Sequence, residues 1–410
     1  MTLRLTSSDR AALDGGRGEG HALAMRIVVA AAEAMGASGL LDITGAHVDG
    51  CLYHGRAGLD FVDALVEGGA EVAVPTTLNV GSLDLLHPEL VRHDEGTGRA
   101  AAQLMAGYEA LGCRPTWTCA PYQLGERPGQ GQQVAWAESN AIAFANSVLG
   151  ARTERYGDFL DISAAITGRA PAVGLHLDEG RRPELVLSVE GLGGDLGEDE
   201  TVFPLVGHVL GREAGTRVAA IVGLPSSTTE DDLKALGAAA ASSGAVAMFH
   251  AVGITPEAPT LSELEDRDLP IVEVSRGMLD EAMRSLSTTS AGRVDAVSVG
   301  TPHYSVPQME RLLELLGGRR CRVPLFVSTG RHVLEQWGRE KATALREAGV
   351  QIVTDTCTYI TPIISPDVEV IMTDSAKWAY YAPSNLGVEV VYGSTRACVE
   401  TAVTGEVEPR

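Results

Sequence analysis

The chain alternates short apolar segments with amphipathic ones, and this alternation constrains its fold more than any other feature. It is most regular between residues 198 and 355. Strand-like segments followed by helical ones at this spacing predict a parallel sheet covered by helices on both faces. The predicted strand–helix pairs are 218–224 with 229–243, 245–253 with 261–265, 271–275 with 277–287, 295–303 with 306–316 and 324–330 with 332–348.

The first third of the chain follows the same pattern, and polar residues gather where its strands end. Helices are predicted around 20–35, 58–68 and 98–112. Each leads into an apolar strand and then a polar loop, in GLLDITGAHVDGCLYHG, AEVAVPTTLNVGS and RPTWTCAPY. Ligands of open α/β sheets bind at the carboxyl ends of strands, so these loops are predicted to line a site.

Length predicts more than one lobe, because 410 residues exceed the size at which single hydrophobic cores stop growing. The pattern loosens around 151–195, and no linker separates the parts cleanly. We therefore predict an α/β protein of α/β/α sandwich lobes with mostly parallel sheets. The lobes are residues 1–200 and 201–410, with a soft boundary. The last segment is predicted as strands in QIVTDTC, VEVIMTDSAKWAYY and VEVVYGS, followed by a short helix near 394–404.

One predicted helix, within ESNAIAFANSVLGART, has an inverted amphipathic pattern. Its other faces are apolar, and a single stripe carries the uncharged polar side chains of Ser139, Asn140, Asn146 and Ser147. Buried amides and hydroxyls are costly unless they are paired. Two interpretations stay open: a polar network that fixes packing or faces another subunit, and a pocket wall of donors and acceptors.

Composition excludes several classes of partner. The net charge of −22 disfavours nucleic acids and anionic membranes, and any anionic ligand would need local cations. No apolar run approaches the length of a membrane span. The N-terminus lacks the layout of a signal peptide, and six scattered cysteines form no disulfide framework. A cytoplasmic protein with reduced thiols is expected.

Individual polar residues suggest chemistry, each with a plainer alternative. Cys119 and Cys357 follow apolar strands, where thiolates could ligate a soft metal or an iron–sulfur cluster or simply fill the core. Lys377 lies among apolar residues and either meets an anionic group or extends to solvent. Arg152 could bind a carboxylate or phosphate through two hydrogen bonds. The chain contains no GxxxxGK, dinucleotide-type GxGxxG or GxSxG motif, which disfavours those nucleotide-dependent enzymes and hydrolases.

Seven segments in order resemble the aconitase X family: DITGAHVDGCLYHG, VPTTLNVGSLD, PTWTCAPYQ, AWAESNAIAFANSVLGARTERYGDF, GTPHYS, DTCTY and TDSAKWAYY. The resemblance spans essentially the whole chain. It implies the aconitase-like fold and a dehydratase of a small hydroxy acid, of the cis-3-hydroxy-L-proline or mevalonate 5-phosphate type. It also implies a small swivelling domain, here expected as a separate subunit.

The resemblance implies an iron–sulfur cluster held by three cysteines, of which Cys119 and Cys357 match two. The third position reads GTPH, so Thr301 replaces the expected cysteine, and a hydroxyl is no substitute for a soft thiolate. Three explanations remain open. Cys51 or an outside group supplies the third ligand, a labile or mononuclear metal binds, or this member works without a cluster.

The family motifs also suggest roles in dehydration. A dehydratase removes a proton beside a carboxylate and expels hydroxide while donors anchor the carboxylate. The possible acid–base or orienting groups are His47, Asp49, Glu138, His303 and Lys377. The possible substrate-binding groups are Thr76, Thr77, Asn79, Ser139, Asn140, Asn146, Ser147 and Arg152. Two alternatives are a diverged, cluster-free enzyme catalysing another elimination, isomerisation or cyclisation, and a non-catalytic partner subunit.

Overall fold

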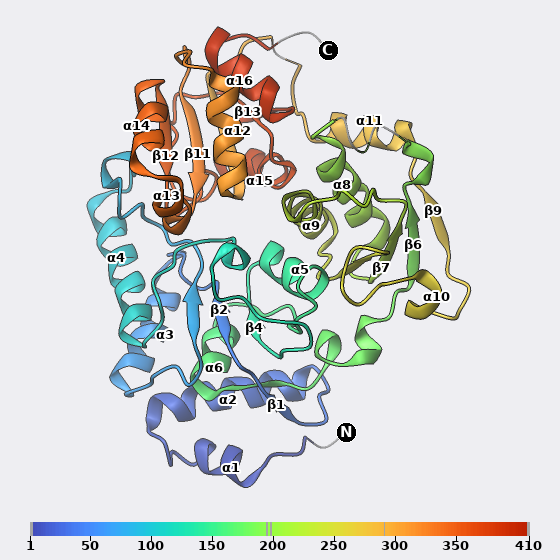
Figure 1. The fold of residues 1–410 in the computed structure, drawn as a ribbon. Coiled ribbons are helices and arrows are strands. Elements are labelled where there is room, and N and C mark those ends of the chain that lie inside the picture. Colours follow the sequence, from blue (N-terminus) through green and yellow to red (C-terminus); the bar gives the residue numbers. More distant parts are fainter. Residues whose placement is uncertain (1–2, 194–195, 197–198, 291, 408–410) are drawn as a thin grey trace. The chain divides into compact units, whose positions relative to one another are not determined.

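A computed structural model describes residues 3–193, 196, 199–290 and 292–407 (Figure 1). The chain divides into two compact units. The first unit comprises the chain up to Leu83 together with His93–Arg182, and the second comprises Asp84–Arg92 and the chain from Pro183 onward. Whether residues 1–200 and 201–410 fold as separate lobes stays a prediction.

The first unit is built on a parallel sheet in the order β3-β2-β4. Residues 114–118 run alongside β3, where Thr77 and Arg114 form a parallel bridge. A two-stranded antiparallel sheet joins β1 to β5. The strands are β1 (Leu40–Asp42), β2 (Ala46–Val48), β3 (Thr76–Leu78), β4 (Ala135–Trp136) and β5 (Arg169–Pro171). The helices are α1 (Ser7–Leu13), α2 (Glu19–Ala34), α3 (Arg56–Glu67), α4 (Glu95–Ala110), α5 (Ser139–Ser147) and α6 (Leu160–Thr167).

The two faces of this sheet carry different residues because side chains alternate along a strand. Ala46, Val48 and Leu78 face the main apolar core, which they share with residues of α2, α3, α4 and α6. Trp136 faces the other way, into a smaller cluster with Phe144 of α5. The sheet of the first unit therefore has an apolar cluster on each of its faces.

The second unit contains two parallel sheets, in the orders β8-β7-β6-β9 and β12-β11-β10-β13-β14. Its strands are β6 (Leu185–Ser188), β7 (Ala219–Val222), β8 (Phe249–Ala251), β9 (Ile271–Glu273), β10 (Ala296–Tyr304), β11 (Leu325–Thr329), β12 (Val350–Val353), β13 (Val370–Thr373) and β14 (Glu389–Tyr392). Its helices are α8 (Val202–Ala214), α9 (Glu230–Gly244), α10 (Leu261–Leu264), α11 (Arg276–Ser285), α12 (Val306–Leu316), α13 (Arg331–Trp337), α14 (Arg339–Glu347), α15 (Ala376–Leu386) and α16 (Thr395–Thr404).

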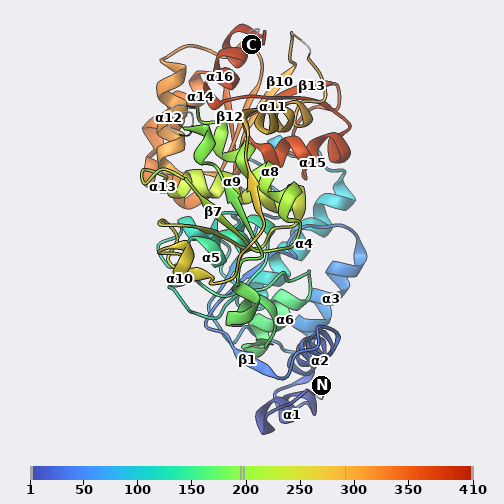
Figure 2. The same ribbon diagram turned by 90° about the vertical axis from the view of Figure 1, so that its right-hand side faces the viewer.

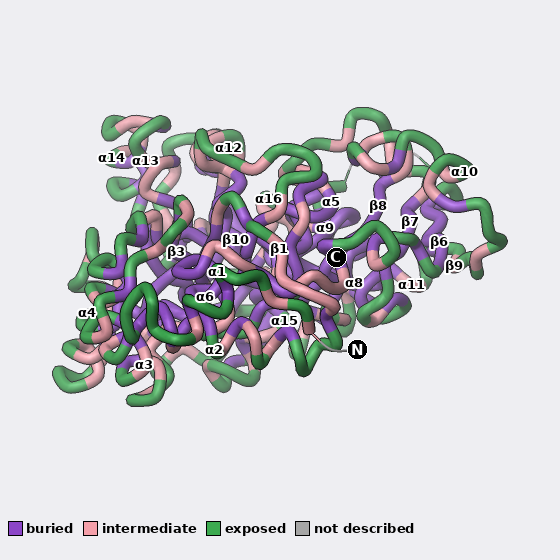
Figure 3. Tube along the Cα trace, turned by 90° about the horizontal axis from the view of Figure 1, so that it is seen from below, coloured by how far each residue is buried: buried purple, intermediate pink, exposed green. Residues whose placement is uncertain are grey.

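Helices α8 and α9 pack side by side (Figure 2) because glycines let their backbones approach. A Cβ on Gly207 would lie 2.1 Å from the carbonyl oxygen of Leu236. The strands β6, β7 and β8 are largely buried, whereas α10 and α14 carry much exposed surface (Figure 3). The predicted α/β class with mostly parallel sheets is confirmed. Within the described residues, none of the helices is long and apolar enough to span a membrane.

Three local predictions were wrong. The predicted helix 332–348 is two helices, since Gly338 adopts φ +99° between α13 and α14. The residues SAKWAYY form the start of α15 and not a strand, because the Ser375 side chain caps the helix by accepting from Trp378 N. Helix α8 was missed, since it is buried almost all round and so lacks a polar stripe.

Candidate active site

In the first unit, four polar residues follow the carboxyl ends of parallel strands. Asp49 follows β2, Asn79 follows β3, Glu138 follows β4, and Cys119 ends the extended segment beside β3. Carboxyl ends of parallel strands meet at one edge of a sheet, and this edge is the usual ligand position in such folds. We call Asp49, Asn79, Cys119 and Glu138 the strand-end group.

Asp49 is held on two sides. Asn79 Nδ2 donates a short hydrogen bond to Asp49 Oδ1, and Asp49 N donates to Asp161 Oδ2 at 2.7 Å. Loss of hydration raises the pKa of Asp49 to about 8, with a further contribution from the negative charge of Glu138, although the bond from Asn79 opposes the shift. The carboxyl group of Asp49 is therefore mostly protonated at neutral pH, unlike an ordinary aspartate.

Glu138 is a buried helix cap in an unusual conformation. Its φ of +72° is costly for a residue other than glycine. Its Oε2 accepts from Asn140 N at 3.0 Å and Ala141 N at 2.9 Å, at the amino end of α5. Hydrogen-bond donors and the helix dipole together favour a carboxylate at such a position. The geometry thus fixes an acidic side chain beside Asp49.

The polar stripe of α5 divides into two parts. At its amino end, Asn140 Nδ2 donates to the carbonyl of Cys119 at 3.0 Å, and Asn140 Oδ1 accepts from Tyr122 at 2.6 Å. Ser139 donates to Glu138 at 3.2 Å. These contacts secure the loop of Cys119 to the strand-end group.

At the carboxyl end of α5, Asn146 joins the chain that follows the helix. Its Nδ2 donates to Thr153 O at 3.1 Å, and its Oδ1 accepts from Thr153 N at 3.0 Å and from Arg181 at 3.1 Å. Ser147 is also buried. Asn146 therefore belongs to a packing network, one of the two interpretations that the sequence left open.

Four other predicted residues of this unit lie apart from the strand ends. His47 and Thr77 share a strand register and a contact of 2.8 Å, and burial lowers the pKa of His47 to about 3, so its ring stays neutral. Thr76 donates to Val74 O at 2.8 Å, near the start of β3. Arg152 pairs with Asp178 and donates to His176 O at 3.2 Å. Among the described residues, no hydrogen bond joins these four side chains to Asp49.

In the second unit, Cys357 lies in a loop whose preceding residues are held in place by hydrogen bonds. Thr354, Asp355 and Thr356 are fully buried. Thr354 donates to Asp84, Asp355 accepts two bonds from Arg331, and Thr356 contacts Thr361 at 2.5 Å. A side chain held this way is preorganised to act as a ligand without further loss of entropy.

His303 lies beside Cys357, and their ligand atoms are within 4.8 Å of one another. His303 Nε2 contacts the Thr356 carbonyl at 3.3 Å, so Nε2 carries the proton and Nδ1 the lone pair. Burial lowers the pKa of His303 to about 4, which keeps the ring neutral. A neutral imidazole and a thiol form a donor pair suited to iron or zinc.

Thr301 and Lys377 border a second feature of this unit, a cavity of about 50 Å³ that could hold a water molecule. Thr301 Oγ1 is buried without a hydrogen-bond partner within the part of the chain that the structure describes. Ser375 donates to the Thr301 carbonyl. Lys377 is buried, with 5% of its surface exposed. The threonine at the third family position is therefore buried beside a small cavity, and the Thr301 carbonyl is held by Ser375.

Sequence reasoning missed Asp161 and favoured no role for Ser375. Asp161 is fully buried, and loss of hydration raises its pKa to about 7. It lies in the first turn of α6, where a lone acidic residue in the apolar run LDISAAI was the available signal. Cys51 is buried as well, and its Sγ donates to Val48 O at 3.6 Å.

The fold and these strand-end groups define an α/β enzyme, and comparisons with known proteins place it among the lyases. Family models described as the first, second and third domains of aconitase X match residues 2–179, 183–284 and 294–404. The chain belongs to the aconitase X family, and it is an aconitase X-type dehydratase.

Three relatives illustrate the match. A cis-3-hydroxy-L-proline dehydratase from Pseudomonas aeruginosa is 42% identical over 410 residues, which cover 98% of this chain and 70% of that protein. A phosphomevalonate dehydratase large subunit from Methanosarcina mazei is 35% identical over 405 residues, which cover 98% of this chain and 98% of that protein. The crystal structure of Thermococcus kodakaraensis aconitase X in its holo-form has a TM-score of 0.87 at 31% identity, covering 97% of this chain and 100% of that one.

Proposed function

We propose that this chain dehydrates a small hydroxy acid such as cis-3-hydroxy-L-proline. The observation that carries the proposal is its 42% identity, across 98% of the chain, to a dehydratase named for that substrate. The second candidate substrate is mevalonate 5-phosphate. It is favoured by a different observation, the match that covers 98% of both this chain and a phosphomevalonate dehydratase large subunit.

Asp49 is proposed as the general acid that protonates the leaving hydroxyl. Its support is a carboxyl group with a pKa of about 8, which holds a proton at neutral pH and can deliver it. Glu138 keeps that pKa high, and Asn79 orients the carboxyl group. Ser139 and Asn140 are proposed to hold the loop of Cys119. We also propose that they donate hydrogen bonds to the substrate carboxylate.

The residues present fit a metal ion better than a cluster held by three cysteines. Cys357 and His303 provide a thiol and a neutral imidazole, and we propose that Cys119 joins them in the assembled enzyme, as the family motif implies. Iron bound there would act as a Lewis acid on the leaving hydroxyl. The hydroxyl of Thr301 does not supply the third thiolate of an iron–sulfur cluster.

Cys51 is a poor replacement for that third thiolate. Burial, with the negative charge of Asp161 nearby, raises the pKa of the Cys51 thiol well above its usual value. Its hydrogen bond to Val48 O also requires the protonated form. We therefore assign Cys51 to the core of the first unit. His47 stays neutral and Lys377 is buried, so we propose positioning roles for both.

A small subunit is proposed to complete the active site. This chain matches phosphomevalonate dehydratase large subunits almost end to end, whereas it covers 70% of the hydroxyproline dehydratase from Pseudomonas aeruginosa. The name of the phosphomevalonate dehydratase relatives, large subunit, implies a small partner subunit, and we propose such a partner for this chain. We also propose that the enzyme works in the cytoplasm, where its six free cysteines would remain reduced.

A substrate competition tests the proposed function. The chain is purified without oxygen together with its small subunit, loaded with iron, and given cis-3-hydroxy-L-proline and mevalonate 5-phosphate in equal amounts. We expect water loss from the hydroxyproline at the higher kcat/KM. Faster turnover of the phosphate ester would favour the second candidate. Full activity in a preparation free of iron would instead indicate a diverged enzyme that works without a metal.

A further inference from the structure

The first unit has a large cavity at the end of its sheet that is opposite to the strand-end group. The cavity measures about 610 Å³, within the usual range of ligand pockets. Its lining comes from where the strands begin: Thr44–Ala46 before and at the start of β2, Val74–Thr77 at β3, and Val134 with Trp136 at β4. Asp49 and Asn79 follow the other ends of these strands. The cavity therefore lies at the other end of this sheet from the strand-end group.

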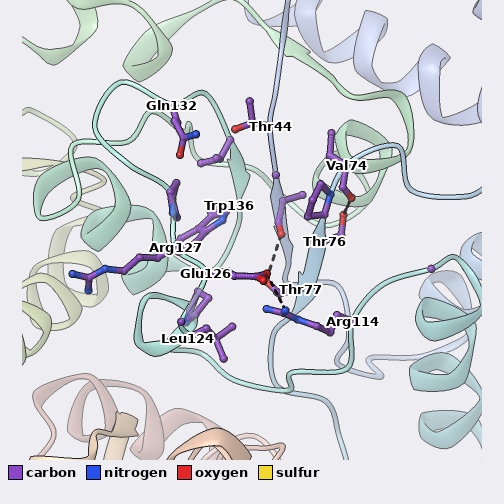
Figure 4. A pocket seen from close by; sticks show the side chains of 18 residues that line it. Thr44, Val74, Thr76, Thr77, Arg114, Leu124, Glu126, Arg127, Gln132 and Trp136 are labelled. Atoms are coloured by element: carbon purple, nitrogen blue, oxygen red, sulfur yellow. Dashed lines mark hydrogen bonds and ion pairs between the residues drawn. The ribbon is translucent and has the colours of Figure 1, made fainter.

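One wall of the cavity carries a cation and an anion together (Figure 4). Arg114 Nη1 lies 3.1 Å from Glu126 Oε2, and Thr77, whose backbone forms a bridge with that of Arg114, also lines the cavity. Thr44 and Gln132 are on another side, and the guanidinium of Arg127 points away from the remaining labelled side chains.

The ion pair is weak enough for a ligand to enter. The side chains of Arg114 and Glu126 are 50% and 82% exposed, so solvent screens their mutual attraction and the pair contributes little to stability. A ligand carboxylate can bind the guanidinium through two hydrogen bonds. A ligand ammonium can then bind Glu126. A plain anion would instead face Glu126 and the net charge of −22.

Apolar groups form the rest of the wall. Val74, Leu124 and the buried Trp136 line the cavity beside Pro75 and Pro121. These surfaces suit a branched aliphatic side chain, which gains free energy on leaving water. We infer that this cavity binds a small zwitterionic amino acid with an apolar side chain, its carboxylate on Arg114 and its ammonium on Glu126, at a site separate from the dehydration site.

Calorimetric titration of the full chain tests this inference. The probes are L-leucine, 4-methylpentanoate, which lacks the ammonium, and isoamylamine, which lacks the carboxylate. We expect L-leucine to bind at least tenfold more tightly than either analogue. Both Arg114→Gln and Glu126→Gln should weaken L-leucine binding at least fivefold, whereas a plain anion would bind Glu126→Gln more tightly.

Two variants control the experiment. Arg99→Gln removes another exposed ion pair, with Glu95 on α4, and should leave binding unchanged. Asp49→Asn changes the strand-end group and should also bind L-leucine as the unaltered chain does. The inference is overturned if L-leucine does not bind, if Glu126→Gln binds it more tightly, or if Asp49→Asn abolishes binding.

Discussion

The carboxyl group of Asp49 gives the sharpest prediction for a single residue. A general acid works while protonated, so kcat should stay level at neutral pH and fall as the pH rises through about 8, the pKa of Asp49. Asp49→Asn keeps the shape but has no acidic proton to give. It should lower kcat about 100-fold or more and remove the fall at high pH. Steady-state rates between pH 6 and pH 9.5 measure both effects.

Asp158→Asn is the matched control for Asp49. Asp158 is exposed, and its negative charge raises the pKa of Asp49 less than the charge of Glu138 or of Asp161 does. The variant should retain kcat and move the fall slightly toward lower pH. Asp49→Asn with unaltered kcat, or a fall in rate that persists in it, would exclude Asp49 as the acid.

Cys357 and His303 give a prediction about metal content. Replacing either by Ser or Ala removes one donor of the pair, so each variant should retain less than about a tenth of the iron bound by the unaltered complex. Cys321→Ser, which changes a partly exposed cysteine of the same unit, should retain all of it. Iron analysis after anaerobic purification measures this. Equal iron in all three variants would contradict the proposed donor pair.

Sequence reasoning reached some of these residues and not others for a physical reason. Asp49, Asn79 and Glu138 each follow a strand, and the ends of parallel strands necessarily share an edge. Asp161 acts on Asp49 across 112 positions of sequence, through one backbone hydrogen bond. Periodicity reports which face of a helix is buried, but not which distant backbone group a buried carboxylate will meet.

At the scale of elements, the two ends of helix α5 have different roles: the amino end holds the loop of Cys119, and the carboxyl end belongs to a packing network. The free energy of unfolding of variants at each end should distinguish these roles. Asn146→Ala removes both bonds to Thr153 and one from the buried Arg181. Donors and acceptors left unpaired in the core should cost about 2 kcal/mol. Ser139→Ala, at the half-buried amino end, should cost less than about 1 kcal/mol. Urea unfolding compares the two, and equal losses would argue against the division of the stripe.

The element boundaries that sequence reasoning misjudged depend on single backbone conformations. Apolar spacing continues through 332–348, yet Gly338 breaks the helix by adopting a positive φ. The start of α15 depends on the Ser375 cap, while the apolar and aromatic residues that follow it also suit a strand. The parallel sheets themselves were predictable because alternation of strand and helix leaves few other arrangements.

At the scale of the whole molecule, buried titrating groups make stability depend on pH. The pKa values of Asp49 and Asp161 are raised to about 8 and about 7, so above pH 6.5 the folded state still holds protons that the unfolded state has lost. Folding stability should therefore fall as the pH rises from 6.5 to 8.5. Burial lowers the pKa of His47 and His303. These two histidines change the stability only below pH 6.5, where the unfolded state binds more protons than the folded state, so their contribution makes stability rise with pH there.

Thermal unfolding across this pH range checks the prediction. Asp161→Asn should flatten the decline, because the amide has no proton to lose. Asp14→Asn, at an exposed position, should leave the decline unchanged. A melting temperature that rises between pH 6.5 and 8.5 would show that other groups dominate.

Dehydration of a small hydroxy acid is the central claim, and one measurement tests it most directly. The iron-loaded complex with its small subunit is incubated with cis-3-hydroxy-L-proline, and the product formed by loss of one water is quantified by NMR. We predict turnover by the unaltered complex. The rate of Asp49→Asn should be lower by about 100-fold or more. Absence of a dehydrated product, from this substrate and from a panel of other hydroxy acids, would contradict the claim.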